Sequence, residues 1–224
     1  IHIVSAWACE NKMVFAQMAT EEKSNEITAI PKLLKMLVLE GSVVTIDAMG
    51  CQKKIAETII DSQGDYIFSL KGNHSMLHKE VQMFLDDAIA HGGDTDYATT
   101  TNGGHGRVEL RKVWYSQEVQ WIADRNDWPG LSSLVAVESQ RIIGDKISTE
   151  RRYFISSLSG KNAETVGQMI RHHWGVENKL HWSLDVSFGE DDCRIRKRCG
   201  AENVSRLRRI DACVKSFSSC GTRS

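Results

Sequence analysis

A strand, helix, strand pattern in residues 42–72 constrains the fold more than any other feature of the chain. The segment SVVTIDAMG is an apolar, β-branched run without alternation, which is typical of a strand buried on both faces. CQKKIAETIIDSQG follows with helical spacing up to Gly64, and DYIFSLKGN is a second short apolar strand. The short joints predict a βαβ unit and therefore an α/β fold with parallel strands at its core.

The segments around this unit also have recognisable patterns. HIVSAWA and MVFAQMA, separated by polar ENK, predict a hairpin, and residues 25–40 predict a first helix between Ser24 and Gly41. Residues 75–91 predict an amphipathic helix, whereas the composition of GGDTDYATTTNGGHGR is typical of a loop. Three alternating strands, RVELRKVWYS, SSLVAVESQRII and TERRYFISSL, come next. Residues 93–159 are therefore predicted to form a β-rich insertion.

The final third returns to helical spacing, in residues 165–184 and again in 201–217. Residues 1–92 and 160–224 are accordingly assigned to one α/β core, a mixed sheet flanked by helices, which the β-rich insertion interrupts before the helix of residues 165–184.

Composition excludes several classes of protein. The six cysteines form no CxxC pair, which favours reduced, inert thiols over a disulfide framework or a zinc site. No apolar run approaches the roughly 18 residues that a membrane span needs, and the first residues do not resemble a signal peptide, so a soluble intracellular protein is expected. The net charge of −1 conceals a basic C-terminal quarter, with 11 Lys and Arg against 7 Asp and Glu from Arg171 onward. Such a run indicates either phosphate contacts or a solvated helix face.

Asp47 is the most informative single residue. A carboxylate at the carboxyl end of a central strand lies where open α/β sheets bind their ligands. If Asp47 is buried there, its charge requires compensation, and a divalent cation is the obvious partner. The alternative is that Asp47 caps the helical segment that follows.

A second group of candidates lies in RHHWGVENKLHWSLDVSFGED. Glu177, His181 and Asp185 are spaced four apart and share one helix face, and Trp174 lies on nearly the same stripe. The acids of this face and Asp47 would suit phosphoryl transfer if the fold brings them together, and the alternative is a solvated polar face. Zinc is disfavoured because HExxH is absent, and nucleophilic or NTP chemistry because GxSxG and GxxxxGK[ST] are absent.

Five segments together resemble a known family. KSNEI, TIDAMGCQ, YIFSLKGNH, HGRVELR and HHWGVENKLHWSLDVSFGEDDCRIR are similar to motifs of the H-repeat-associated insertion-sequence transposases, in the same order and over nearly the whole chain. TIDAMGCQ and HWGVENKLHW are the most specific of these motifs. The resemblance implies an RNase H-like fold and a DDE transposase, in which three acids hold two Mg²⁺ or Mn²⁺ ions.

The resemblance also implies roles for individual residues. Asp47 would be the second acid and Glu177 the third, while the first lies in a DGK-type motif that the 224 residues do not contain. Either the sequence starts after this acid and the strand that carries it, or the gene is a decayed remnant. Phosphate contacts are expected from basic residues in two segments, with further supporting roles for His181, Trp174 and Asp185; the basic candidates are Arg194, Arg196, Lys197, Arg198, His105, Arg107, Arg111, Arg171 and Lys179. Arg171 and Lys179 are not at the spacing of the Tyr, Arg, Glu, Lys signature of the wider family.

The expected activity is strand cleavage and strand transfer on double-stranded DNA at terminal inverted repeats, by a homodimer bound to DNA. The expected location is the bacterial cytoplasm, with association to the nucleoid when DNA is bound. Two alternatives stay open: a DNA-binding remnant without catalysis, and a nuclease of the same fold that does not join strands. Trp174 and Trp182 either stack on a displaced base or pack in the core.

Overall fold

The computed structural model describes residues 3–20, 26–104, 107–175 and 200–218, together with residues 184, 186, 188–189 and 194–195. The chain divides into two compact units, one formed by residues 1–38 with 171–224 and the other by residues 39–170. No described helix combines the length and the apolar character that crossing a bilayer requires.

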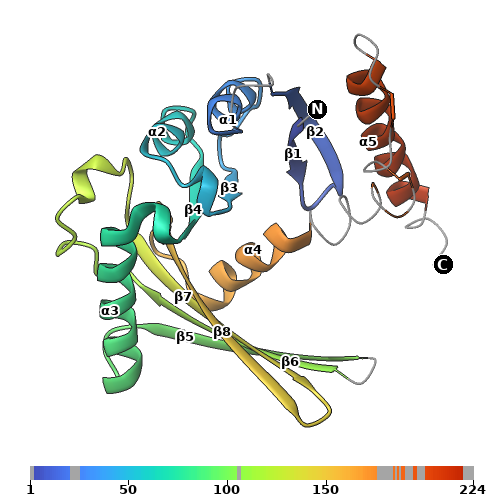
Figure 1. Cartoon of the computed structure of the whole chain (residues 1–224). Helices are drawn as coiled ribbons and strands as arrows, with labels where there is room; N and C mark the ends of the chain where they lie inside the picture. The colour runs from blue at the N-terminus through green and yellow to red at the C-terminus, as the bar shows by residue number, and fades with distance from the viewer. Residues whose placement is uncertain are drawn as a thin grey trace. The chain divides into compact units, whose positions relative to one another are not determined.

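The unit of residues 39–170 is built on a six-stranded sheet of order β3-β4-β8-β7-β6-β5 (Figure 1). Strand β3 (Val43–Ile46) pairs in parallel with β4 (Asp65–Leu70), and helix α2 (Lys53–Asp61) connects them. The predicted βαβ unit is therefore confirmed. Its first strand differs from the prediction, because β3 lies at the edge of the described sheet and is only half-buried.

The remaining four strands are antiparallel. They are β5 (Asp96–Gly104), β6 (Arg107–Ser116), β7 (Ser133–Ile143) and β8 (Lys146–Ser156), and β8 also pairs with β4. The sequence predicted β6, β7 and β8 but assigned residues 92–107 to a loop, which is wrong for β5. Strand β5 forms because β6 supplies hydrogen-bond partners along its length, although most of its side chains remain exposed. Because β4 pairs with β8, the strands of residues 93–159 continue the sheet that β3 and β4 begin.

Two helices cover opposite faces of this sheet. Asp86 of α3 (Ser75–His91) contacts Arg151 and Tyr153 on one face, while α4 (Ala163–Gly175) packs with Gly167 against Val113 on the other. Figure 1 shows the two helices on the two sides of the strands. One hydrophobic core lies under α4 and contains Ile67, Val113, Tyr115, Val135, Val137, Phe154, Leu158, Ala163, Val166 and Ile170.

The unit of residues 1–38 and 171–224 contains the predicted hairpin. Strands β1 (Ile3–Ala8) and β2 (Met13–Ala19) are antiparallel, helix α1 (Glu26–Leu34) packs against both, and α5 (Gly200–Ser218) packs against β2. Helix α1 ends six residues before the predicted boundary at Glu40. Tighter turns follow it, in which Met36 and Leu37 donate to carbonyls three residues back, and the side chains of Met36 and Val38 are exposed.

Candidate functional site

Asp47 lies directly after β3, where the chain enters the short 3₁₀ helix η1 (Ala48–Gly50). The Gly50 N–H donates to Asp47 Oδ1 across 3.4 Å, so Asp47 caps η1, which is the alternative that the sequence left open. The carboxylate is exposed, so the condition of burial, under which its charge would require a compensating cation, is not met. An apolar run does not reveal that its strand lies at a sheet edge, and at an edge the residue after the strand reaches water.

Two side chains that directly follow the neighbouring parallel strand hold the turn that carries Asp47. Asn73 Nδ2 donates to the Ala48 carbonyl across 2.7 Å, and His74 Nε2 lies 2.6 Å from the Cys51 carbonyl. Because a carbonyl only accepts, His74 carries a proton on Nε2. Both residues belong to η2 (Gly72–His74), which follows the end of β4. Residues 48–51 are therefore anchored at both ends by the KGNH segment (71–74).

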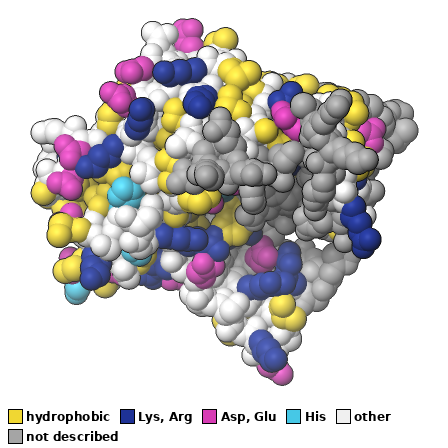
Figure 2. Space-filling model, turned by 45° about the horizontal axis from the view of Figure 1, so that its top comes forward, with side chains coloured by type: hydrophobic (Ala, Val, Ile, Leu, Met, Phe, Trp, Pro, Cys, Tyr) yellow, Lys and Arg dark blue, Asp and Glu magenta, His cyan; other side chains and the backbone are white. Residues whose placement is uncertain are grey.

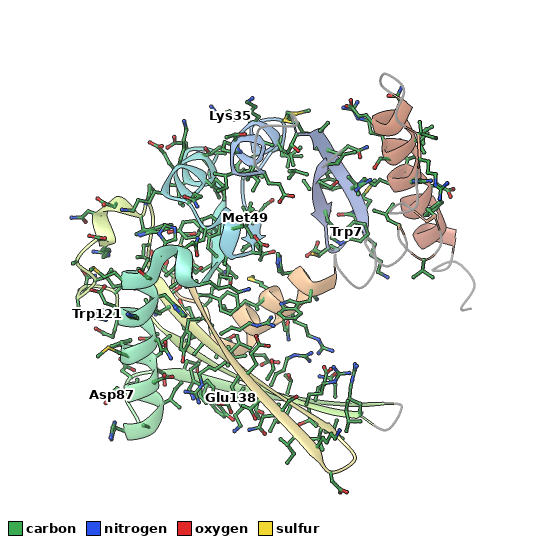
Figure 3. The ribbon with its side chains drawn as sticks, in the orientation of Figure 1. Trp7, Lys35, Met49, Asp87, Trp121 and Glu138 are labelled. Carbon is green, nitrogen blue, oxygen red and sulfur yellow. The ribbon has the colours of Figure 1, made fainter. Side chains whose placement is uncertain are left out.

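Packing reinforces this anchor. The edge of the His74 ring meets Trp128, with ring centroids 5.1 Å apart, and both Trp128 and Cys51 are buried. Burial raises the pKa of the Cys51 thiol to about 12, so the thiol is neutral at physiological pH and unsuited to nucleophilic attack. For Cys51, this supports the prediction that the cysteines are inert thiols. Met49 follows Asp47 within η1 and is exposed at the end of β3 (Figure 3).

Sequence patterns alone did not identify Asn73 and His74 as site residues, although their position after a parallel strand is a signal for them. The carboxyl ends of neighbouring parallel strands meet at one edge of a sheet. Polar residues that directly follow the neighbouring strand, DYIFSL, are therefore expected to lie beside Asp47.

A carboxylate in this setting fits a hard divalent cation. The exposed Asp47 side chain has one long hydrogen bond to a backbone amide, which leaves oxygen lone pairs for a metal such as Mg²⁺ or Mn²⁺. Within the described part of the chain no group of three or more His, Cys, Asp or Glu residues is arranged to hold an ion. Of the predicted acids, Asp47 is the one that lies within the described residues.

The second predicted acid, Glu177, lies outside the described residues, as do Lys179, His181 and Asp185. The helix that precedes them is α4, which the structure describes as far as Gly175. Arg171 and Trp174 lie in its last turns, and both side chains are exposed at the surface. The helix predicted over residues 165–184 therefore agrees with α4 in the part that the structure describes.

The predicted DNA contacts are described only in part. Arg194 is exposed, whereas Arg196, Lys197, Arg198 and His105 lie outside the described residues. Arg107 and Arg111 are both on β6, where Arg107 Nε and Arg111 Nη2 lie 3.1 and 2.6 Å from the carboxylate of Glu109. On the face shown in Figure 2, Lys and Arg side chains are interspersed with Asp and Glu. This face therefore shows no continuous basic patch among the described residues.

A separate charged network, which the sequence did not predict, ties α3 to the sheet. Arg151 Nη2 lies 2.6 Å from Glu138, Arg151 Nη1 lies 2.6 Å from Asp86, and Lys112 Nζ lies 3.3 Å from Glu138. The Arg151 guanidinium also stacks over Trp114 at 5.6 Å. Figure 3 shows Glu138 on the sheet, away from the end of β3. The network is structural, since each of its charges is bonded within the unit.

Comparison with known proteins supports the family resemblance. The family described as "Transposase DDE domain" matches residues 1–208. The chain is 42% identical over 215 residues to a protein of Escherichia coli (strain K12) named "H repeat-associated putative transposase YhhI", with 94% of this chain and 57% of that protein covered. It is 40% identical over 214 residues to the "Putative transposase YncI" of Escherichia coli O157:H7, covering 94% of this chain and 55% of the relative. The chain therefore spans little more than half the length of these relatives.

Proposed function

Because the chain belongs to the DDE transposase domain family, we propose that it forms the catalytic part of an insertion-sequence transposase that cleaves and joins DNA strands. The observation that carries the proposal is the setting of Asp47. Its carboxylate is exposed at the carboxyl end of a parallel strand pair, the usual ligand edge of an open α/β sheet, within a segment that the family match covers. A mixed sheet flanked by helices is consistent with the RNase H-like fold of the family.

In this proposal, Asp47 and Glu177 are two of the three carboxylates that hold two Mg²⁺ or Mn²⁺ ions. When bound, the metal ions would activate a water or a DNA 3′-OH and neutralise charge on the leaving oxygen. The chain itself supplies a carboxylate of fixed position, because Asn73 and His74 fasten the backbone on either side of η1. Oxygen ligands favour these hard cations over zinc.

The remaining acid is expected in a DGK-type motif, which the 224 residues do not contain. We propose that sequence outside these residues provides it, together with the strand that bears it, and that residues 93–159 are an insertion in the catalytic core. Double-stranded DNA with terminal inverted repeats is the proposed substrate, a homodimer the proposed assembly, and the bacterial cytoplasm the proposed location.

The function is tested by following a labelled duplex with inverted-repeat ends in the presence of Mg²⁺ or Mn²⁺. The protein is a version that carries the DGK-type motif, and Asp47→Asn and Glu177→Gln are its matched variants. A transposase yields nicked and joined products that both variants lose, while DNA binding by the variants persists because phosphate contacts carry most of the affinity.

The two alternatives give different products in the same assay. Cleavage without joined products identifies a nuclease of this fold. Binding without any cleavage identifies a DNA-binding remnant, and either result overturns the proposed function.

A further inference from the structure

The outer parts of hairpins β5–β6 and β7–β8 extend beyond both α3 and α4 (Figure 1). We call this four-stranded region the wing, and its described residues are 100–104, 107–111 and 139–150. Residues directly opposite one another on neighbouring strands point to the same side of a sheet, so the pairing register assigns each wing residue to a face.

The pairing register places the charged residues of the wing on one face of the sheet. Three rows of paired residues lie on this face, counted from the tip of the hairpins inward. They are Gly104, Arg107, Ile143 and Lys146; then Asn102, Glu109, Arg141 and Ser148; then Thr100, Arg111, Ser139 and Glu150. The following row contains Val113 and Val137, which belong to the core under α4. These rows therefore form the α4-side face of the wing.

The opposite, α3-side face has no charged residue in the same region. Its rows contain only apolar and uncharged polar residues, namely Thr101, Gly103, Val108, Leu110, Gln140, Ile142, Ile147 and Thr149. The α4-side face carries four cations and two carboxylates. Among the paired residues of the wing, charge is thus confined to one side of the sheet, while Asp145 lies in the turn between β7 and β8.

The two carboxylates are already bonded to arginine side chains. Glu109 binds both Arg107 and Arg111, and Glu150 binds Arg152 in the adjoining row. Arg141 and Lys146 are exposed and form no ion pair with any described residue. The α4-side face therefore presents Arg107 and Arg111, which Glu109 holds in place. Beside them lie Arg141 and Lys146, whose charge is available to a polyanion.

From this separation of charge we infer that the α4-side face of the wing binds the phosphate backbone of duplex DNA. The inference rests on the proposed function and names a surface through which the protein holds its substrate. Arg, Lys, Ser, Thr and Asn are the side chains that supply most phosphate contacts, and this face presents all of them. Antiparallel strands are also an established means of docking on duplex DNA. Contacts of this kind are independent of base sequence.

Two neighbouring residues of β8 provide a matched test. Ser148 and Thr149 are both exposed and lie on opposite faces, Ser148 opposite Arg141 and Thr149 opposite Gln140. Ser148→Glu and Thr149→Glu therefore change the net charge of the protein equally. Binding of a fluorescent duplex is measured by anisotropy over a range of salt concentrations, and thermal unfolding checks that both variants remain folded.

We expect Ser148→Glu to weaken binding about tenfold at low salt and Thr149→Glu to change it by less than about twofold. Replacing Arg141 and Lys146 together by Gln lowers the slope of log affinity against log salt by roughly two, to the same extent on terminal-repeat and unrelated duplexes. Equal effects of the two Glu variants, or an unchanged salt slope in the Gln variant, overturn the inference.

The strand-cleavage assay separates failure of this inference from failure of the proposed function. Cleavage that depends on Asp47 but is insensitive to Ser148→Glu refutes the wing surface alone. A face-dependent loss of binding without any Asp47-dependent cleavage supports the wing surface and refutes the transposase function.

Discussion

The position of Asp47 depends on two hydrogen bonds from side chains that never contact the proposed metals. Asn73 and His74 bind the Ala48 and Cys51 carbonyls, one at each end of the turn that begins at Asp47. Ala48, Gly50 and Cys51 are buried while Asp47 is exposed, so packing and these two hydrogen bonds together hold the turn in place. We regard Asn73 and His74 as positioning residues.

His74 can be tested with two amides that differ in reach. The side-chain nitrogen of Gln takes the place of Nε2, whereas that of Asn takes the place of Nδ1 and falls short of the Cys51 carbonyl. We expect His74→Asn to raise amide exchange in residues 48–51 at least tenfold and His74→Gln to retain most of the protection. Hydrogen exchange measures this without any metal.

The same pair separates positioning from general stability. Mn²⁺ affinity is expected to fall in His74→Asn and to recover in His74→Gln, provided that both unfold at similar temperatures. If the two variants exchange and bind Mn²⁺ alike, the hydrogen bond to Cys51 has no positioning role.

Glu138 makes the stability of the folded protein depend on acid pH. Burial alone would raise the pKa of Glu138, but hydrogen bonds and charge from Arg151 and Lys112 outweigh burial and hold the pKa below its usual value of 4.5. A carboxyl group whose folded pKa is lowered stabilises the protein above the unfolded pKa and loses that contribution as pH falls through the folded pKa. Stability is therefore expected to decline below about pH 4.5.

Chemical denaturation at pH 7 and pH 4 tests this role. Glu138→Gln is expected to lower the free energy of unfolding by about 3 kcal/mol at pH 7, because Arg151 and Lys112 lose a nearly buried partner. The control is Glu150→Gln, whose side chain is 61% exposed and whose pair with Arg152 contributes less than about 1 kcal/mol. Equal losses in the two variants, or a loss in Glu138→Gln that is as large at pH 4, would contradict this account.

At the scale of elements, the contact between α4 and the sheet depends on the absence of a side chain at Gly167. A Cβ atom built there would lie 2.8 Å from Val113 Cγ2, and the β-branched Val113 has little freedom to move. We expect Gly167→Ala to destabilise the protein by about 1–2 kcal/mol, since the clash outweighs the gain in helix propensity. Thermal unfolding of Gly167→Ala, Val113→Ala and the double variant measures this.

The double variant shows whether the change in stability comes from the clash with Val113 or from the helix propensity of the residue at position 167. A clash predicts that the double variant loses less stability than the two single variants together. Stabilisation by Gly167→Ala alone would show that α4 does not pack as closely as described.

The elements differ in how far the sequence predicted them. Helix α3 was predicted with its observed bounds, because its apolar residues recur at helical spacing and Gly92 ends it in a left-handed conformation (φ 74°). Strand β5 was missed because its Thr, Asn and Gly residues show no alternation, and only its partner β6 makes it a strand. The exposure of Asp47 was missed because it depends on the place of β3 in the sheet, which local patterns do not contain.

For the whole molecule, a net charge of −1 means that the proposed affinity for DNA requires local groups of cations. The α4-side face of the wing and the basic C-terminal quarter are two candidates for such groups. Binding should therefore be steep in salt although the protein is nearly neutral, and a slope near zero in an anisotropy titration would contradict phosphate contacts as its source.

Calorimetric titration of Mn²⁺ into a version of the protein that carries the DGK-type motif, beside its Asp47→Asn and Glu177→Gln variants, tests directly whether the two acids bind metal. We expect two bound ions in the unsubstituted protein and loss of at least one of them in each variant. Binding that is absent from the unsubstituted protein, or unchanged in Asp47→Asn, would show that Asp47 is only the cap of η1 and not a metal ligand.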